Sequence, residues 1–166
     1  MKNGTARIVS SIAFALLLTA LAFAQTTPAP DSDQEISARL SRALGVPVDR
    51  ITLHFYLVKA GGVTEITAKD PQDAAAVAAI QKYLQNQKEL WEKGKDPVVE
   101  VHSKPPESVA TLRKMRNEIT FYVAKTDTGG VLRMFSINDQ ARTAIQDFMR
   151  FEIAEHKTGD SPTTDQ

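Results

Sequence analysis

Between residues 50 and 59, apolar side chains occupy every second position. The apolar positions are Ile51, Leu53, Phe55 and Leu57. Because successive side chains of a strand point to opposite faces of a sheet, this alternation predicts a strand with one buried face. Gly61 and Gly62 follow, and glycine readily adopts the positive φ angles of a tight turn. We therefore predict a hairpin whose second strand runs over residues 63–68.

Two longer segments show apolar side chains three and four positions apart, which is the spacing of an amphipathic helix. For the first segment we predict a helix with Ser32 or Asp33 as its N-cap. The second segment spans residues 72–93 and contains neither Gly nor Pro. We predict that its helix begins at Asp70-Pro71, because Asp accepts hydrogen bonds from the free amides of a first turn and Pro is tolerated at the first helical position.

The same order of elements returns in the second half of the chain. The matching segments are Phe55-Tyr56-Leu57-Val58-Lys59 with Phe121-Tyr122-Val123-Ala124-Lys125, and Gly61-Gly62 with Gly129-Gly130. Their spacing predicts a second hairpin loop that is longer than the first. A short helix is predicted before the second hairpin, from about Glu107 to Arg116, and a longer one after it, from Asp139 to about His156.

The fold class that follows is α+β. We predict two tandem α-β-β-α repeats, over residues 33–95 and 106–157, within a single duplicated domain. One hairpin with one helix cannot bury its apolar face. Two copies can form a four-stranded antiparallel sheet with the helices on one face.

The N-terminal residues have the three parts of a secretory signal peptide. Two basic side chains precede a mostly apolar run over residues 8–23, and Ala22-Phe23-Ala24 fits the small-x-small rule for cleavage. The run is at or below the roughly 17 residues of a membrane-spanning helix, so we predict cleavage and no stable membrane anchor afterwards. This interpretation gives a signal peptide over 1–24, a flexible leader over 25–32, and export to the periplasm or the medium. The last residues, 158–166, are predicted to be a disordered tail.

Charge and composition exclude several classes of function. The 166-residue chain has 20 Lys and Arg against 20 Asp and Glu, and it contains no cysteine. A near-neutral chain offers no electrostatic footprint for nucleic acid, and a chain without cysteine can use neither disulfides nor thiolate chemistry. A phosphate-binding glycine loop, a Gly-x-Ser-x-Gly motif and a His-Glu-x-x-His motif are all missing. We therefore predict no cofactor and favour a non-enzymatic binding or interaction module.

A group of polar and aromatic side chains is predicted to share one face of the sheet. The group consists of His54, Tyr56, Thr120 and Tyr122. If the helices cover the opposite face, these side chains form a shallow surface for a small ligand, an envelope protein or a second copy of the chain in a homodimer. The alternative is a half-exposed sheet face whose aromatic side chains pair across strands.

Glu152 and His156 lie one helical turn apart, a spacing that can direct two ligands to one metal ion. His102, between the two halves, is a candidate third ligand. The alternative is a solvated helix face without a metal, and the sequence favours it because no third ligand is evident from spacing. The sequence therefore predicts no metal, with Glu152 and His156 as the candidates. A periplasmic metal-handling protein and a small enzyme of unrecognised type stay open as alternative functions.

Several short motifs carry a resemblance to a known group of proteins. They are Lys69-Asp70-Pro71, Ile80-Gln81, Gly94-Lys95-Asp96-Pro97 and the repeated hairpin. Over residues 50–159 the chain resembles small exported bacterial proteins of unknown role that contain two such units, some of which carry the name aspartate carbamoyltransferase. The group often has His where this chain has Tyr83. The Ser-Thr-Arg-Thr run with which carbamoyltransferases hold carbamoyl phosphate is missing, so the motifs give that name no support.

Overall fold

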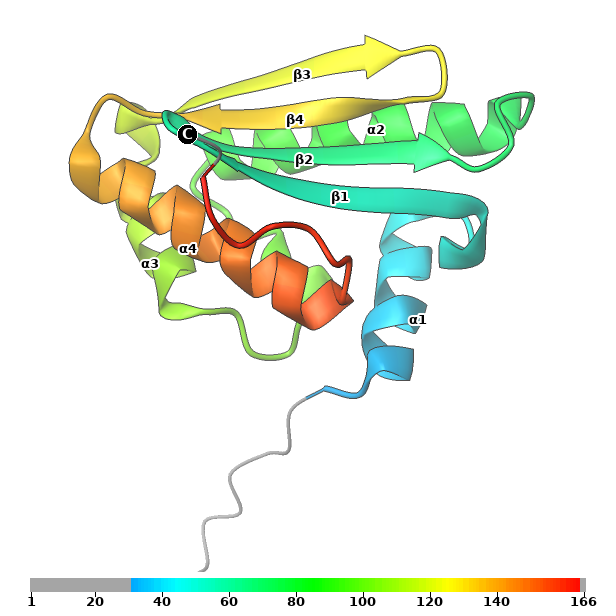
Figure 1. Ribbon diagram of the computed structural model, residues 1–166, viewed down its shortest axis with the longest axis horizontal. Helices are drawn as coiled ribbons and strands as arrows, with labels where there is room; N and C mark the ends of the chain where they lie inside the picture. Colours follow the sequence, from blue (N-terminus) through cyan, green and yellow to red (C-terminus); the bar gives the residue numbers. More distant parts are fainter. Residues whose placement is uncertain (1–30, 165–166) are drawn as a thin grey trace, which may run out of the picture.

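The computed structural model describes residues 31–164. Its helices and strands follow one another in the order that the sequence predicts (Figure 1). The elements are α1 (Asp33–Leu44), β1 (Ile51–Val58), β2 (Gly61–Ala68), α2 (Ala74–Glu92), α3 (Glu107–Lys114), β3 (Thr120–Thr126), β4 (Gly129–Phe135) and α4 (Asp139–His156). The prediction of an α+β fold is confirmed. The predicted signal peptide over residues 1–24 lies outside the described residues, as does most of the predicted leader.

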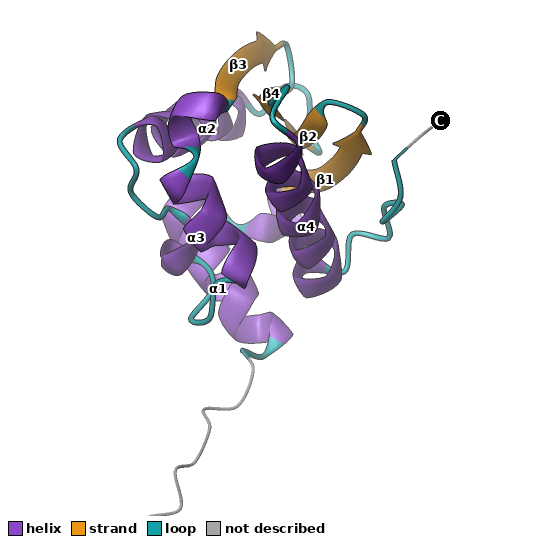
Figure 2. Cartoon of the chain, turned by 90° about the vertical axis from the view of Figure 1, so that its left-hand side faces the viewer, coloured by secondary structure: helices purple, strands orange, loops and turns teal. Residues whose placement is uncertain are grey.

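The four strands form one antiparallel sheet in the order β1-β2-β4-β3. All helices lie on the same face of this sheet (Figure 2), as predicted. Helix α2 packs mainly on β3 and β4, whereas α4 packs on β1 and β2. Each long helix therefore covers the hairpin of the other half, and neither half can bury its own hairpin alone.

The prediction that Gly61 and Gly62 form the first hairpin turn is wrong. Residues 59–60 make the turn, and both glycines belong to β2. A Cβ atom on Gly61 would collide with the carbonyl oxygen of Met134 in the neighbouring strand, and one on Gly62 would collide with Met149 of α4. These glycines are required for close approach of a strand and a helix, not for a turn.

The prediction of a longer second loop is also wrong, because both hairpin loops contain two residues. In the first hairpin Val58 pairs with Gly61, and in the second Thr126 pairs with Gly129. The two hairpins thus have the same register, with Leu53 rather than Phe55 equivalent to Phe121. The duplication of the whole unit stays a prediction, since a shared order of elements does not establish common descent.

Helix α2 begins later than the sequence predicts. Asp70 forms a turn before the helix, where its Oδ1 accepts from the backbone N–H of Gln72 at 2.9 Å. The N-cap is Asp73, whose Oδ1 accepts from the N–H of Ala76 at 3.0 Å. Two aspartates within four residues both match the capping signal, and the second one starts the helix. The N-cap of α1 is Ser32, one of the two residues predicted.

The hydrophobic core lies between the sheet and the helices. Its largest fully buried apolar side chains are Trp91, Ile66, Ile80, Leu84, Leu112, Met134, Ile145 and Met149. Burial of each such side chain contributes about 1.5–3 kcal/mol to folding, so this layer supplies the stability of a chain without disulfides. Within residues 31–164, no helix is both long and apolar enough to span a membrane.

Candidate metal centre

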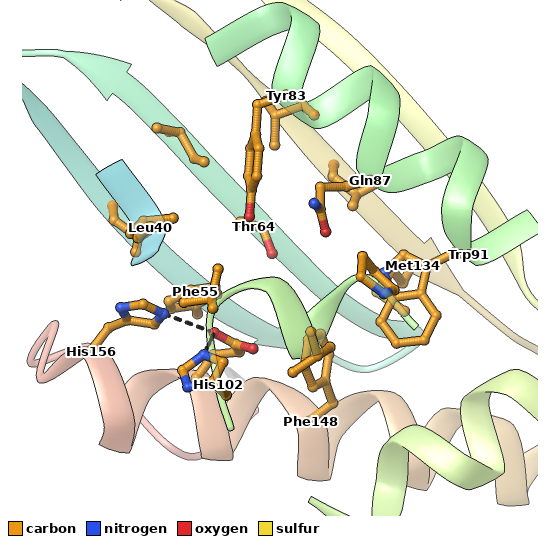
Figure 3. Close-up of a pocket in the computed structure, with 18 residues that line it drawn as sticks. Leu40, Phe55, Thr64, Tyr83, Gln87, Trp91, His102, Met134, Phe148 and His156 are labelled. Carbon is orange, nitrogen blue, oxygen red and sulfur yellow. Dashed lines mark hydrogen bonds and ion pairs between the residues drawn. The ribbon is translucent and has the colours of Figure 1, made fainter. Parts of the chain in front are cut away.

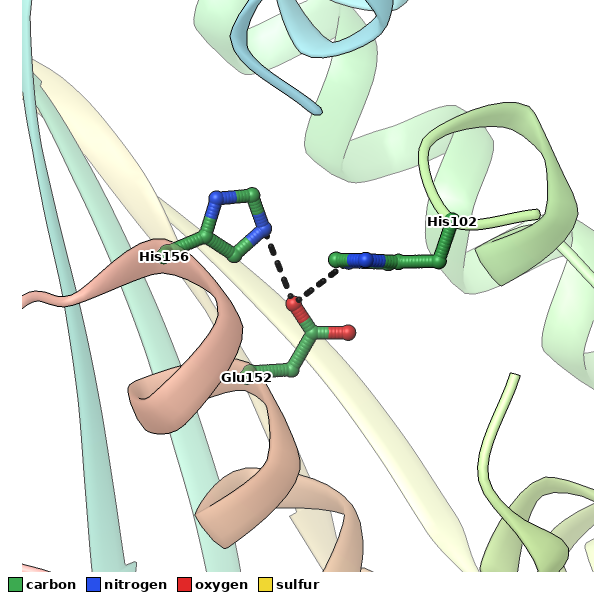
Figure 4. Close-up of side chains that lie close together, drawn as sticks. All are labelled: His102, Glu152 and His156. Carbon is green, nitrogen blue, oxygen red and sulfur yellow. Dashed lines mark hydrogen bonds and ion pairs between the residues drawn. The ribbon is translucent and has the colours of Figure 1, made fainter. Parts of the chain in front are cut away.

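Two distant segments bring three side chains that can bind metals into contact inside the core. Glu152 and His156 lie one turn apart on α4, and His102 follows a single 3-10 turn (Val98–Glu100) that joins the two halves. The Nε2 atom of His102 lies 3.3 Å from Oε2 of Glu152, and Nε2 of His156 lies 3.1 Å from the same oxygen (Figure 4). One ligand atom from each residue lies within 4.8 Å of those of the other two.

His102 and Glu152 are buried and His156 is nearly so, so the expectation of a solvated helix face is wrong. His102 is 2% exposed and Glu152 6% exposed. Aromatic rings cover both histidines: Phe55 stacks on His156 with 5.8 Å between ring centroids, and Phe151 meets the ring of His102 edge-on at 4.9 Å. The last turn of α4 is therefore packed against β1 and the joining segment.

The carboxyl group of Glu152 is ionised despite its burial. Burial raises its pKa, but the hydrogen bonds from His102 and His156 together outweigh burial and lower the pKa to about 2. No Lys or Arg and no second carboxylate line the adjacent cavity among the described residues. Among the described residues, the ion-pair partners of Glu152 are His102 and His156.

The cluster forms one wall of an internal cavity between the sheet, α2 and α4. The cavity has a volume of about 50 Å³, and a cavity needs roughly 10–15 Å³ to hold a single water. Most of the lining is apolar. In Figure 3, Tyr83 and Gln87 of α2 point into the cavity from the side opposite His102 and His156. Thr64 of β2 adds a hydroxyl to the lining.

Two buried polar atoms at the cavity have no hydrogen-bond partner within residues 31–164. They are Nε2 of Gln87 and Nδ1 of His102. Gln87 is only 7% exposed. An unsatisfied buried donor or acceptor costs about 1–3 kcal/mol, so each of these atoms needs a partner in the cavity, such as a water, an ion or a ligand.

The geometry of the cluster fits a metal ion. Metal–nitrogen and metal–oxygen bonds of about 2.0–2.2 Å separate neighbouring ligand atoms by about 3.0–3.5 Å in tetrahedral or octahedral sites. The measured separations of 3.1 and 3.3 Å between Glu152 and the histidines fall in this range. Two imidazoles and one carboxylate bind first-row transition metals and leave coordination positions open. The remaining nitrogen of a metal-bound histidine normally donates a hydrogen bond, so Nδ1 of His102 still needs an acceptor in such a site.

A clamp at the protein surface fixes the backbone on both sides of His102. The guanidinium group of Arg39 donates to the carbonyl oxygen of Val101 at 3.2 Å and makes two hydrogen bonds of 2.8 Å to Asp31. Asp31 in turn accepts from the backbone N–H and the hydroxyl of Ser103, both at 2.7 Å. These hydrogen bonds, the one from Arg39 first, lower the pKa of Asp31 well below its usual value. The clamp therefore couples α1 to the position of His102.

The side chains predicted to share the open face of the sheet do share it, but they do not form one site. Tyr56 on β1 and Tyr122 on β3 are 39% and 54% exposed, and they lie at opposite edges with β2 and β4 between them. His54 also lies on β1, where its Nδ1 is 2.8 Å from Oδ1 of Asp160. Thr120 is exposed at the start of β3.

The C-terminal segment has a defined position along the edge of the sheet. Residues 158–164 were predicted to be part of a disordered tail. The structure instead places Asp160 beside β1, where its Oδ2 accepts from the backbone N–H of Phe55 at 2.9 Å. This carboxylate satisfies a backbone donor that an edge strand would otherwise expose.

Sequence reasoning named all three clustered residues, with His102 only as a candidate third ligand, and missed the cavity. Gln87 carried a usable signal, because it lies four residues after Tyr83 and four before Trp91, on the stripe of α2 that is otherwise apolar. A polar side chain at such a position either pairs in the core or faces a ligand. Comparisons with family models, with curated proteins and with solved structures found no match to this chain.

Proposed function

We propose that this protein is an exported domain that binds a divalent transition-metal ion through His102, Glu152 and His156. The observation that carries the proposal is the convergence of two buried side chains and the nearly buried His156, from two segments about 50 residues apart in sequence, at the separations of metal ligands. The signal-peptide pattern over residues 1–24 supports export.

Charge favours a metal over a purely structural hydrogen-bonded cluster. An ionised carboxylate in an apolar interior is costly unless a positive charge compensates it. Glu152 has no Lys or Arg partner among the described residues. A bound divalent cation would place positive charge beside this carboxylate and would use all three donor atoms.

The donor set selects the class of metal. Two imidazole nitrogens and one carboxylate suit Zn²⁺, Cu²⁺, Ni²⁺ or Co²⁺, whereas Ca²⁺ and Mg²⁺ prefer six or more oxygen ligands. Three protein ligands leave at least one coordination position open, unlike the four protein ligands of a closed structural zinc site. The proposed site is therefore one at which the metal can accept a further ligand.

Isothermal titration calorimetry with Zn²⁺ tests this function. The purified protein, treated with a chelator, should bind one ion per chain. His156→Gln and His102→Gln should each weaken binding at least 100-fold, because each removes one of three ligands. His54→Gln is the matched control, since His54 lies on the other face of the sheet, and it should bind like the native protein.

Circular dichroism spectra of all variants establish that the fold is retained. The proposal fails if the native protein shows no saturable binding of Zn²⁺, Cu²⁺, Ni²⁺ or Co²⁺. It fails equally if folded His156→Gln and His102→Gln bind these ions as tightly as the His54→Gln control.

A further inference from the structure

We infer that the cavity beside His102, Glu152 and His156 binds a small organic carboxylate, which coordinates the metal ion and accepts a hydrogen bond from Gln87. This inference rests on the proposed metal site. It adds the chemical class of the molecule that occupies the open coordination position.

The lining of the cavity fits a small molecule with an apolar body and one polar end. Apolar side chains from the sheet and from both long helices form most of the wall, among them Trp91, Phe148 and Met134. Binding sites for small molecules generally combine such walls with a few polar groups that fix orientation. The cavity volume of about 50 Å³ is about a third of the roughly 150 Å³ of a cavity that binds benzene, so it suits a carboxylate of two or three carbon atoms and excludes a six-membered ring.

The polar groups that face the cavity call for an oxygen acceptor. Nε2 of Gln87 is a buried donor without a partner among the described residues. The hydroxyl of Tyr83 stays protonated, because burial first and then the charges of Glu152 and Glu100 raise its pKa. It can therefore donate as well. The donors of Gln87 and Tyr83 lie on one side of the cavity, and the proposed metal ligands lie on the other. Both would attract an oxygen anion placed between them.

Charge selects a carboxylate among oxygen ligands. A divalent ion bound to Glu152 and two neutral histidines leaves one uncompensated positive charge in an apolar environment. A monovalent carboxylate neutralises it, and the attraction is strong because the interior screens charges less than water. Binding of the carboxylate should require the metal, because the metal supplies the open coordination position.

Calorimetry with acetate and propionate on zinc-loaded protein tests the inference. Both probes should bind to the zinc-loaded protein and show no binding to the metal-free protein. Acetamide has the size of acetate without its charge, and it should bind at least 10-fold more weakly. Gln87→Leu should weaken acetate binding about 10-fold or more, since a hydrogen bond to a charged group is lost, and should leave the affinity for Zn²⁺ unchanged.

Gln87→Leu removes an unpaired polar group from the core and is expected to fold at least as stably as the native chain. Gln85→Leu on the exposed side of α2 is the matched control and should bind acetate normally. The inference is overturned if the protein binds Zn²⁺ but neither carboxylate, or if Gln87→Leu binds acetate like the control. Failure to bind any metal overturns the proposed function itself, so the two failures are distinct.

Discussion

Replacement of Gly62 by alanine tests how closely α4 packs on the sheet. A Cβ atom on Gly62 would lie 2.9 Å from Sδ of Met149 and 3.2 Å from Cγ2 of Ile145, and closer still to Cγ of Met149. Both neighbours are 0% exposed. The methionine side chain is flexible but fully buried in a close-packed interior, so the added methyl group overpacks this part of the core.

Two opposing terms set the size of the effect. Overpacking in a close-packed core costs about 1–3 kcal/mol. Alanine also restricts the unfolded chain relative to glycine, which stabilises the fold by about 0.4–1 kcal/mol. We therefore expect Gly62→Ala to lower the free energy of unfolding by about 1–2 kcal/mol. For a domain of this length the melting temperature should fall by about 3–10 °C.

Urea denaturation of a double-mutant cycle measures the contact directly. Met149→Ala alone should cost about 2–5 kcal/mol, because it leaves a cavity. In that background the methyl group of Gly62→Ala enters free space, so its cost should disappear, which gives a coupling energy of about 1–3 kcal/mol. An equal loss from Gly62→Ala in both backgrounds would refute the assignment of this glycine to helix packing.

Three further predictions concern other parts of the chain. Asp73→Ala should cost about 1 kcal/mol in thermal unfolding because it removes the N-cap of α2, whereas Asp70→Ala should cost less; an equal cost would contradict the assignment of the cap. Asp31→Asn should lower the melting temperature above about pH 4, and the difference should shrink as the pH falls below 4, because the hydrogen bond from Arg39 holds the pKa of Asp31 below its usual 3.8. A constant difference down to pH 2 would be inconsistent with this cause. If the open sheet face forms a homodimer, sedimentation velocity should detect a dimer that Tyr122→Ser dissociates; a native protein that is strictly monomeric would end that prediction.

The regular elements were predictable because their signals are local. Alternation over residues 50–59 placed β1, and helical spacing placed α4 with the bounds observed, Asp139–His156. The role of Gly62 was not predictable, since the same residue type suits a turn and a close helix contact. Capping at Asp70 was mispredicted because Asp73, three residues later, carries the same signal.

The candidate site was half predictable for the same reason. Glu152 and His156 share one helix, so their spacing alone places them on one face. His102 is 50 residues from Glu152 in sequence. Its position beside Glu152 and His156 depends on how the joining segment packs against α1, and no periodic pattern in the sequence indicates that packing. The cavity and the orientation of Gln87 depend likewise on the crossed arrangement of the two long helices over the opposite hairpins.

The central claim is that His102, Glu152 and His156 hold a metal ion. Anomalous diffraction at the zinc absorption edge, from crystals of zinc-saturated protein, tests it most directly. The account predicts one anomalous peak at about 2.0–2.2 Å from Nε2 of both histidines and from a carboxylate oxygen of Glu152. Zinc peaks elsewhere, with the three side chains still hydrogen-bonded only to one another, would contradict it.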